Sequence, residues 1–398
     1  MVKIILKRGR EESLKRFHPW VFSGAIAQMS GEPAEGDIVG VYASDGTFLA
    51  LGHYQIGSIA VRVLSFDSDV LSPDFWKVML SRALAERKAI GLHRSGSQTN
   101  CYRLVHGEGD NLPGLVIDWY DGVCVMQAHS VGMFRSRLQI AQALKDVYGD
   151  ELKAIYDKSS GTAPFKAGLD VVDGYIYKRD GFSDDNQLVL ENGHKFLVNW
   201  TEGQKTGFFL DQRENRHLVE RYAQGRNVLN LFCYTGGFSV YALAGGAVHV
   251  DSVDSSLKAI DMVGKNIALN GFGPDRHESF CCDAIDLLKS VPEGKYDMMI
   301  VDPPAFAKHR GALHNALRAY QRLNAAAISR VAPGGLIFTY SCSQVVDKET
   351  FALTVFSAAA QTRRSVRILD RLNQPADHPV NIYHPEGEYL KGLLLYVE

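Results

Sequence analysis

Two segments of the chain carry side chains that could do covalent chemistry. The first is Asp302-Pro303-Pro304, which follows the apolar run 296–301, and the second is Ser341-Cys342-Ser343, which follows the apolar run 335–339. A cysteine thiolate can add to carbon 6 of a pyrimidine ring, which makes carbon 5 reactive enough to accept a methyl group. The addition requires a lowered thiol pKa or a nearby base. A lone cysteine is more often a buried hydrophobic side chain, but its position beside Asp302 favours a nucleophile.

The proline pair also indicates a class of substrate. Prolines stiffen a loop, and because proline has no N–H, the loop's carbonyl groups are left to face the cleft. In methyltransferases that act on an exocyclic nitrogen, this motif is followed directly by an aromatic residue that stacks on the target base. Here Ala305 takes that position and Phe306 comes one residue later. The motif therefore favours a nucleobase substrate and disfavours amino-group chemistry, and the alternative is an ordinary strand that ends in prolines.

A second group of residues could bind a nucleoside. The apolar run 228–231 ends in the turn 232–237, which contains Gly236 and Gly237, and a helical pattern begins at residue 238. Asp254 ends the next apolar run, where a carboxylate can accept hydrogen bonds from both ribose hydroxyls. The turn lacks the G-x-G-x-x-G pattern of a dinucleotide site, so a nucleoside without phosphates, such as S-adenosylmethionine (SAM), fits better. The alternative is an ordinary strand-to-helix turn.

Three further segments have both a functional and a structural interpretation. Segment 203–213 could close over a cofactor with an amino-acid tail, or it could be a domain linker, and Asp211 is the expected N-cap of the helix that follows. Asp283 could accept a hydrogen bond from an adenine amino group, cap the next helix, or do both. Glu386 could act as a base, although ordinary surface residues are the simpler interpretation of its segment.

Composition and charge restrict the class of protein. The 398 residues are 46% hydrophobic and 22% charged, with a net charge of −2, which excludes a protein that coats nucleic acid with its whole surface. RNA contact would use a local patch such as the basic N-terminus, which could also be a solvated face. We expect no membrane span and no signal peptide, and hence a cytoplasmic protein. The six cysteines form no C-x-x-C pair, so neither a metal site nor a disulfide framework is expected.

The elements that must position these residues fall into three predicted parts. Residues 1–72 contain short strands, one of them over 21–27, and indicate a small β-barrel. Residues 73–200 begin with a helix and continue with strands, a helix over 133–148 and a hairpin at Asn192-Gly193, which indicates an α+β domain. The polar stretch 178–186 is expected to be a surface loop. Residues 201–398 alternate strands and helices, which predicts an α/β domain with a mostly parallel sheet.

Together, these segments resemble the RlmI-type ribosomal RNA large-subunit methyltransferases, which form 5-methylcytosine with SAM. The resemblance covers nearly the whole chain and rests on residues 18–24 (His-Pro-Trp-Val-Phe-Ser-Gly), 103–114, 203–213, 232–238, 302–304, 341–343 and 385–392. It implies a PUA domain, which is a small RNA-binding barrel, then an α+β domain and a Rossmann-like class I SAM-dependent methyltransferase domain. It also implies that Cys342 is the nucleophile and that Asp254 holds the SAM ribose.

The predicted site follows from the motifs and the resemblance. We expect Cys342 to be catalytic, with Asp302 and Glu386 as candidate bases, because other RNA cytosine-C5 methyltransferases carry a second cysteine where this chain has Ala305. The residues expected to bind SAM are Lys205, Phe208, Asp211, Arg213, Phe232, Tyr234, Thr235, Gly236, Asp254, Ser255, Asp283, Asp302 and Pro303. Those expected to bind RNA are Lys7, Arg8, Arg10, Arg16 and Phe306.

The expected activity is SAM-dependent formation of 5-methylcytosine in 23S ribosomal RNA through a cysteine adduct at carbon 6. A uracil-C5 or amino-nitrogen RNA methyltransferase is the alternative among enzymes, and Cys342 argues against nitrogen chemistry without separating cytosine from uracil. A non-catalytic PUA-bearing RNA-binding or assembly protein is the alternative of another class. The expected partner is large-subunit ribosomal RNA, no membrane contact is expected, and a homodimer is left open.

Overall fold

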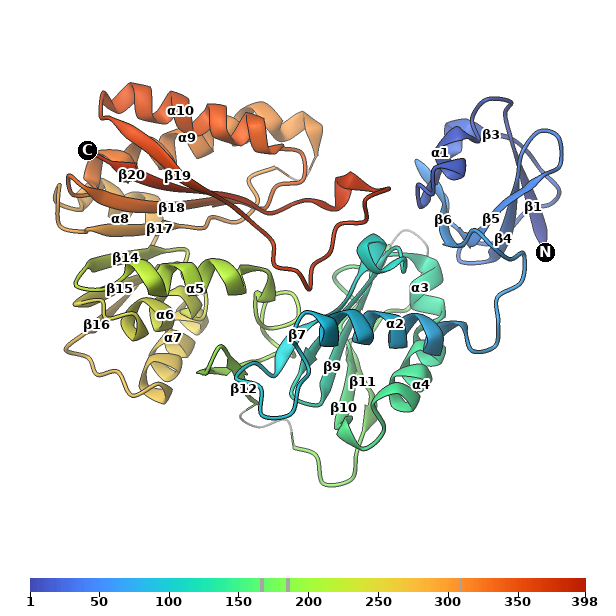
Figure 1. The fold of residues 1–398 in the computed structure, drawn as a ribbon, viewed down its shortest axis with the longest axis horizontal. Helices are drawn as coiled ribbons and strands as arrows, with labels where there is room; N and C mark the ends of the chain where they lie inside the picture. The colour runs from blue at the N-terminus through green and yellow to red at the C-terminus, as the bar shows by residue number, and fades with distance from the viewer. Residues whose placement is uncertain (165–167, 184–186, 308) are drawn as a thin grey trace. The chain divides into compact units, whose positions relative to one another are not determined.

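The chain forms two compact units, each assembled from separate stretches of sequence. The computed structural model describes residues 1–164, 168–183, 187–307 and 309–398, drawn as a ribbon in Figure 1. Unit 1 comprises Met1–Val189, Val198–Leu210 and Ala376–Gly387, and unit 2 comprises Leu190–Leu197, Asp211–Pro375 and Glu388–Glu398. None of the described helices is both long and apolar enough to cross a bilayer.

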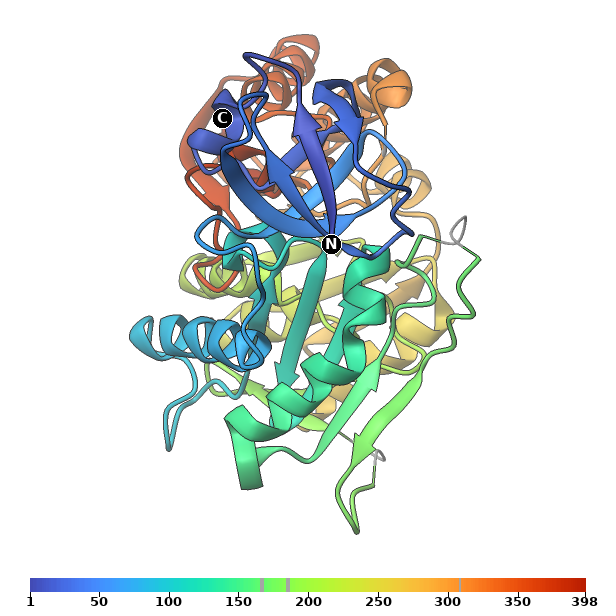
Figure 2. The same ribbon diagram turned by 90° about the vertical axis from the view of Figure 1, so that its right-hand side faces the viewer.

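Residues 1–66 of unit 1 form a curved six-stranded sheet, drawn in blue in Figure 2. The strands are β1 (Val2–Leu6), β2 (Trp20–Phe22), β3 (Ile26–Met29), β4 (Ile38–Tyr42), β5 (Phe48–Tyr54) and β6 (Ile59–Ser65), in the order β2-β6-β5-β4-β1-β3, with the short helix α1 (Glu12–Lys15) between β1 and β2. Alternating side chains such as Ile4 and Leu6 fill the apolar interior. A Cβ on Gly52 would lie 2.2 Å from the carbonyl oxygen of Arg62, so glycine permits the close approach of β5 and β6.

The second part of unit 1 is a sheet packed against helices. Its strands are β7 (Cys101–His106), β8 (Leu115–Tyr120), β9 (Val123–Ala128), β10 (Ala154–Asp157) and β11 (Gly174–Lys178), in the order β11-β10-β9-β8-β7, and its helices are α2 (Phe75–Ala89), α3 (Val131–Arg135) and α4 (Arg137–Tyr148). Helix α4 lies in front of the sheet in Figure 2 and contacts α2. The ring of Tyr148 stacks on that of Trp119 in this core, with 4.1 Å between their centroids.

Unit 2 is built on a doubly wound sheet. Over the described residues its strands are β14 (Asn227–Leu231), β15 (His249–Asp254), β16 (His277–Cys281), β17 (Met298–Val301), β18 (Gly335–Ser341), β19 (Val366–Asn373) and β20 (Lys391–Val397), in the order β16-β15-β14-β17-β18-β20-β19. Strands β14 to β18 pair in parallel, whereas β20 is antiparallel to both of its neighbours. The strand order reverses between β14 and β17, so the topological switch point lies at the carboxyl ends of these two strands.

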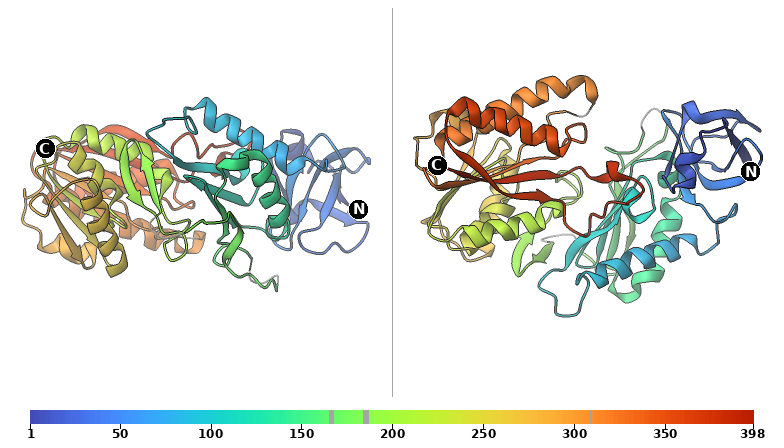
Figure 3. Two further views of the ribbon diagram at one scale, coloured as in Figure 1. Left: turned by 90° about the horizontal axis from the view of Figure 1, so that it is seen from below. Right: turned by 45° about the horizontal axis from the view of Figure 1, so that its top comes forward.

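Helices cover both faces of this sheet, as Figures 1 and 3 show, which is why its central strands β17 and β18 are buried along their whole length. They are α5 (Arg213–Tyr222), α6 (Gly237–Ala244) and α7 (Leu257–Leu269) on one face and α8 (Ala284–Ser290), α9 (Leu313–Arg330) and α10 (Lys348–Thr362) on the other. A hairpin of β12 (Leu188–Glu191) and β13 (His194–Leu197) precedes them. The backbone N–H of Leu197 donates to Asn266 on α7 (2.9 Å), which ties β13 to the helical layer.

The predicted fold class, a Rossmann-like α/β domain preceded by a small barrel and an α+β part, is confirmed. The hairpin at Asn192-Gly193 is also confirmed, and both of its turn residues have positive φ angles of 50° and 84°. The domain limits at 72/73 and 200/201 stay predictions. Of the predicted surface loop 178–186, the last three positions lie outside the described residues.

Three local predictions were wrong. The expected strand 21–27 is interrupted by a 3₁₀ turn at Ser23–Ala25, which separates β2 from β3. The expected helix 133–148 breaks at Ser136 into α3 and α4. Asp211 is not an N-cap, because it lies inside the 3₁₀ turn η5 (Leu210–Gln212) and Gln212 precedes the first residue of α5.

Candidate functional site

Asp302 and Cys342 leave the sheet of unit 2 on adjacent strands. β17 and β18 are parallel neighbours in which Val301 pairs with Thr339, so both residues follow carboxyl ends at the same edge. β14 pairs with β17 on its other side, which brings the turn that begins at Phe232 to this edge too. Ligands of doubly wound sheets bind at this edge, beside the switch point.

Buried hydroxyl groups fix the loop that carries Cys342. Ser341 Oγ donates to Tyr320 Oη at 3.0 Å, and Ser343 Oγ lies 3.1 Å from the same phenol oxygen. The ring of Phe306 packs against that of Tyr320, with 4.7 Å between centroids, and is partly buried in the core. Tyr320 therefore joins the loops after β17 and β18, and Phe306, predicted to bind RNA, has a packing role in this unit.

The thiol of Cys342 is a weak acid in its surroundings. Burial raises its pKa to about 11, and the negative charges of Asp302 and Asp211 add to the shift. The ammonium group of Lys391 acts in the opposite direction. The thiol is therefore protonated at neutral pH, and it needs a base or an additional positive charge to become a nucleophile.

Lys391 is a buried cation beside this thiol that the sequence analysis did not identify. It opens β20 opposite Ser341 of β18, and its Nζ donates to the carbonyl oxygens of Ser343 and Val346, each at 2.6 Å. Burial lowers its pKa to about 8, and Cys342 opposes that shift. The lysine holds the loop after Cys342 and supplies positive charge. The sequence did contain a sign of this role, because Lys391 is the one charged residue of the otherwise largely apolar strand β20.

Asp302 has a pKa close to neutrality. Burial raises it to about 7, and the nearby carboxylate of Asp211 adds to the shift. The opposing effects come from Gln212, whose Nε2 donates to Asp302 Oδ2 at 2.9 Å, and from the positive charge of Arg216. Arg216 is itself held by a bidentate ion pair with Glu191, with both distances 2.8 Å. Asp302 can therefore both lose and take up a proton near pH 7.

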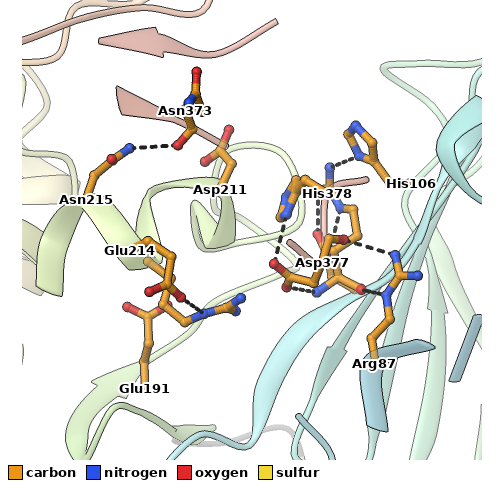
Figure 4. Close-up of polar contacts among 12 residues, drawn as sticks. Arg87, His106, Glu191, Asp211, Glu214, Asn215, Asn373, Asp377 and His378 are labelled. Atoms are coloured by element: carbon orange, nitrogen blue, oxygen red, sulfur yellow. Dashed lines mark hydrogen bonds and ion pairs between the residues drawn. The ribbon is translucent and has the colours of Figure 1, made fainter. Parts of the chain in front are cut away.

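A chain of amide groups orients the partner of Asp302. Asn215 Nδ2 donates to Gln212 Oε1 at 2.6 Å and approaches the carbonyl oxygen of Asn373 at 3.3 Å, the contact drawn in Figure 4. With its oxygen engaged in this way, Gln212 presents its amino group to Asp302. Gln212 and Asn215 were not identified from the sequence, although their spacing of three residues at the start of α5 places them on one face.

Asp211 presents a carboxylate oxygen without a partner. Tyr389 Oη donates to its Oδ2 at 2.7 Å, whereas its Oδ1 is buried and has no hydrogen-bond partner among the described residues. A buried carboxylate oxygen without a donor is costly and calls for one from a ligand. The ammonium group of an amino-acid tail would supply such donors, so this residue fits the corresponding end of SAM.

The turn after β14 is built around the carboxylate of Asp254. Its Oδ2 accepts the N–H of Tyr234 and its Oδ1 accepts the N–H of Ser256, both at 2.9 Å. Each oxygen retains a second lone pair, so the two can still accept a pair of ribose hydroxyls. Asp254 therefore fits the nucleoside end of SAM.

Two bulky residues of this turn adopt a strained backbone. Phe232 and Tyr234 have φ angles of 59° and 46°, in the left-handed region that side chains with a Cβ rarely occupy. Gly236 follows at φ 82°, and a Cβ there would lie 3.1 Å from Val263. Strain of this kind persists where the surroundings impose it, and it is concentrated at ligand sites.

The other predicted SAM-binding residues of unit 2 surround the same strand ends with different local roles. Asp283 caps α8 by accepting two backbone N–H groups through Oδ1, which leaves its exposed Oδ2 available. Arg213 is buried, and its Nε lies 3.2 Å from a carboxylate oxygen of Glu214. Ser255 is exposed directly after β15, whereas Thr235 and Pro303 are buried.

Lys205 and Phe208 belong to unit 1, whereas the other predicted SAM-binding residues belong to unit 2. Phe208 is buried, and its carbonyl oxygen accepts from Tyr120 Oη at 3.3 Å. Thr206, between them, donates to Asp118 at 2.5 Å, and Lys205 is exposed with a φ of 52°. The predicted segment 203–213 thus divides between the two units at residue 210.

The remaining predicted residues also lie in unit 1. Glu386 is on an exposed turn, with one carboxylate oxygen 3.7 Å from His18 Nε2. The predicted RNA-binding residues Lys7, Arg8, Arg10 and Arg16 are exposed on the barrel. The structure therefore does not bring Glu386 into the unit that holds Cys342.

Comparison with known sequences gives a family for the N-terminal barrel and for most of the chain that follows it. The profile of the S-adenosylmethionine-dependent methyltransferases matches residues 102–395, and that of the PUA-like domain matches residues 4–66. Ribosomal RNA large subunit methyltransferase I of Aeromonas hydrophila is 41% identical over 98% of this chain and 98% of its own length. The protein of the same name from Shewanella amazonensis is 39% identical over 100% of this chain and 99% of its own.

Solved structures share the fold over the whole chain. A putative SAM-dependent methyltransferase from Streptococcus mutans superposes with a TM-score of 0.84 at 24% identity, covering 100% of both chains. A putative methyltransferase in complex with SAH gives a TM-score of 0.85 at 24% identity and the same coverage. The chain therefore belongs to the S-adenosylmethionine-dependent methyltransferases, in the family of the ribosomal RNA large subunit methyltransferases I.

Proposed function

We propose that this protein methylates carbon 5 of a cytosine in 23S ribosomal RNA through a covalent adduct with Cys342. The observation that carries the proposal is the position of Cys342 and Asp302, which follow the carboxyl ends of the neighbouring parallel strands β18 and β17. The names of the full-length relatives support ribosomal RNA of the large subunit as the substrate. We propose further that the barrel, residues 1–72, binds this RNA.

Residues of unit 2 would hold the cofactor. Asp254 would accept the ribose hydroxyls, and the unpartnered oxygen of Asp211 would accept from the amino group of the tail. Bound SAM supplies an electrophilic methyl group on a sulfonium, whose positive charge also favours ionisation of a nearby thiol. Lys391 adds a second positive charge and keeps the loop of Cys342 in place.

The adduct activates the ring. Cys342 gives its proton to a base, and its sulfur forms a bond to carbon 6 while the electron pair of the C5–C6 double bond becomes available at carbon 5. Carbon 5 would then bond to the methyl group with this pair, and the electrons of the broken methyl–sulfur bond would stay on the departing thioether sulfur. The ring at this stage is saturated at both carbons and carries one hydrogen in excess at carbon 5.

Asp302 completes the cycle in this proposal. With a pKa of about 7 it can accept the proton from carbon 5, and the electron pair of that C–H bond re-forms the double bond as the C–S bond breaks. The thiolate of Cys342 is released with its electrons. Asp302 is favoured over Glu386 as this base because it lies in the same unit as Cys342 and influences its pKa.

Mapping of methylated nucleotides tests the proposed reaction directly. Ribosomal RNA from cells with and without the protein would be compared by bisulfite sequencing, and 23S RNA from the deficient cells would then be incubated with purified enzyme and SAM. We expect one cytosine to lose methylation in the deficient cells and to regain it in the incubation. Methylation at uracil or at an exocyclic nitrogen would contradict the proposal.

Asp254→Ala is expected to lower the affinity for SAM at least tenfold. The change removes charge-assisted hydrogen bonds worth about 1.5–3 kcal/mol, and it frees the N–H groups of Tyr234 and Ser256 that shape the turn. Isothermal titration calorimetry measures the effect. Asp261→Ala, at an exposed position of α7, is the matched control and should bind SAM like the wild type. An unchanged affinity of the Asp254 variant would remove this residue from the site.

Replacing Arg8, Arg10 and Arg16 together by alanine is expected to weaken RNA binding and to flatten its dependence on salt. These side chains are exposed on the barrel, and each phosphate contact that is lost releases roughly one counterion fewer. Fluorescence anisotropy over a series of salt concentrations measures both effects, and SAM affinity serves as the control. A salt dependence equal to that of the wild type would show that these arginines are solvated and do not contact RNA.

A further inference from the structure

Three side chains with metal-ligand chemistry converge in unit 1, outside the site described above. His18 comes from the barrel, and His384 and Glu386 come from the stretch 376–387 near the end of the chain. One ligand atom from each residue lies within 4.8 Å of the other two. The cluster therefore joins two parts of the unit that are more than 300 residues apart in the sequence.

His384 is the least explained member of this cluster. Its side chain is only 3% exposed, and neither ring nitrogen has a hydrogen-bond partner among the described residues. A buried imidazole without hydrogen bonds is unfavourable unless a ligand occupies it.

The distances within the cluster suit a shared ion better than direct hydrogen bonds. Glu386 Oε1 lies 3.7 Å from His18 Nε2, and its Oε2 lies 3.9 Å from His384 Nε2, both too long for hydrogen bonds. Ligand atoms bound tetrahedrally to one zinc ion at about 2.1 Å are about 3.4 Å apart. Small side-chain shifts would bring the three atoms to that separation.

Trp20 contacts both histidines of the cluster. His18 Nδ1 contacts Trp20 twice, 3.4 Å from its carbonyl oxygen and 3.3 Å from its backbone nitrogen, so Nε2 is the ring nitrogen that faces the cluster. In the tautomer with hydrogen on Nδ1, which donates to the carbonyl oxygen, Nε2 keeps its lone pair for a metal. The indole of Trp20 packs against His384, with 4.3 Å between ring centroids, and its N–H donates to Glu108 at 2.9 Å. Trp20 thus fixes both histidines.

We propose that His18, His384 and Glu386 bind one divalent transition-metal ion, of which Zn²⁺ is the best match to two imidazoles and a carboxylate. The ion would fasten the barrel to the stretch 376–387. Three protein ligands leave a fourth position for water or another ligand. The sequence analysis expected no metal because it considered cysteine pairs alone.

A second cluster of similar composition in the described chain provides a contrast. His249, Asp251 and Glu278 of unit 2 also lie within 4.8 Å of one another. Asp251, however, already accepts from His249 Nε2 at 3.0 Å, from Lys295 Nζ at 2.9 Å and from Tyr296 Oη at 2.5 Å. A lysine ammonium thus occupies the place of a cation, and no metal is expected there.

Metal titration of the full-length protein tests the proposal. Protein stripped with EDTA is titrated with Zn²⁺ in competition with a chromophoric chelator, and with Co²⁺, whose visible absorption reports a tetrahedral site. Glu386→Gln and His18→Gln alter the more exposed ligands, which avoids disturbing the buried His384. His249→Gln is the matched control from the second cluster.

We expect one Zn²⁺ per chain in the wild type and in the His249 variant, and affinity at least tenfold lower in both ligand variants. Zn²⁺ should also raise the melting temperature of the wild type but not that of Glu386→Gln, with the metal-free proteins melting alike. Absence of stoichiometric binding to the wild type would overturn the proposal. Equal affinity of Glu386→Gln, or loss of binding in the His249 variant alone, would overturn it too.

Discussion

Cys342→Ala is expected to abolish methyl transfer, with a loss on the order of 10⁴-fold or more, while SAM affinity and fold are nearly unchanged. Carbon 5 of a pyrimidine acquires enough electron density only after addition at carbon 6, and in the proposal no other side chain supplies that addition. The thiol is partly buried and small, so its removal costs only about 1 kcal/mol of stability. Transfer of a radiolabelled methyl group from SAM to 23S RNA measures the activity.

Cys282→Ala is the matched control, because Cys282 is also partly buried in unit 2 but belongs to the loop after β16. It should retain wild-type turnover. RNA with 5-fluorocytosine at the target should trap the wild-type enzyme covalently, since fluorine cannot leave carbon 5 as a proton does. The Cys342 variant should form no adduct. Substantial turnover by that variant, or failure of the wild type to form the adduct, would leave nitrogen methylation as the better mechanism.

Asp302→Asn is expected to lower turnover by roughly 10²–10⁴-fold and to increase stability at alkaline pH. The folded-state pKa of about 7 lies above the unfolded value of 3.8, so the folded protein binds more protons than the unfolded chain between those two values. The contribution of Asp302 to stability therefore falls as pH rises from about 4 to about 7. An uncharged amide avoids this loss.

Melting temperatures at pH 5 and pH 8 measure the stability effect, and the advantage of the Asn variant should be larger at pH 8. The rising limb of the wild-type rate near pH 7 should disappear in the variant. Asp261→Asn, an exposed change on α7, should alter neither property. If the Asn variant were less stable at pH 8 than at pH 5 relative to the wild type, Asp302 would not be a buried group of raised pKa.

The architecture of unit 2 could be predicted because its strands are buried on both faces. Segments such as 335–341 are mostly apolar and are buried throughout, and helical patterns separate them, which leaves few arrangements other than a parallel sheet. The strand β11 (Gly174–Lys178) was missed because none of its residues is fully buried, so that no apolar alternation marks it. The interruption at Ser23–Ala25 was missed because it depends on strand pairing far along the chain: β2 before it pairs with β6, whereas β3 after it pairs with β1.

The candidate site was predictable to the extent that strand ends define it. Asp302, Cys342 and Asp254 each follow an apolar run, and the carboxyl ends of parallel strands share one edge. Gln212 acts on Asp302, which lies 90 positions later in the sequence, and Lys391 acts on Cys342, which lies 49 positions earlier. Only folding of the sheet brings the members of each pair together. The functional roles of all these residues stay predictions until the variants are measured.

The place of β20 in the sheet has a consequence for the timing of biosynthesis. This strand lies between β18 and β19, although it is the last strand of the sheet to be translated, and the buried Lys391 that supports Cys342 is its first residue. Residues 211–375 can therefore be on the nascent chain, with every predicted catalytic group of unit 2 already synthesised, while the loop of Cys342 still lacks the contact with Lys391 that holds it. Translation must reach the final strand before the thiol is set in place.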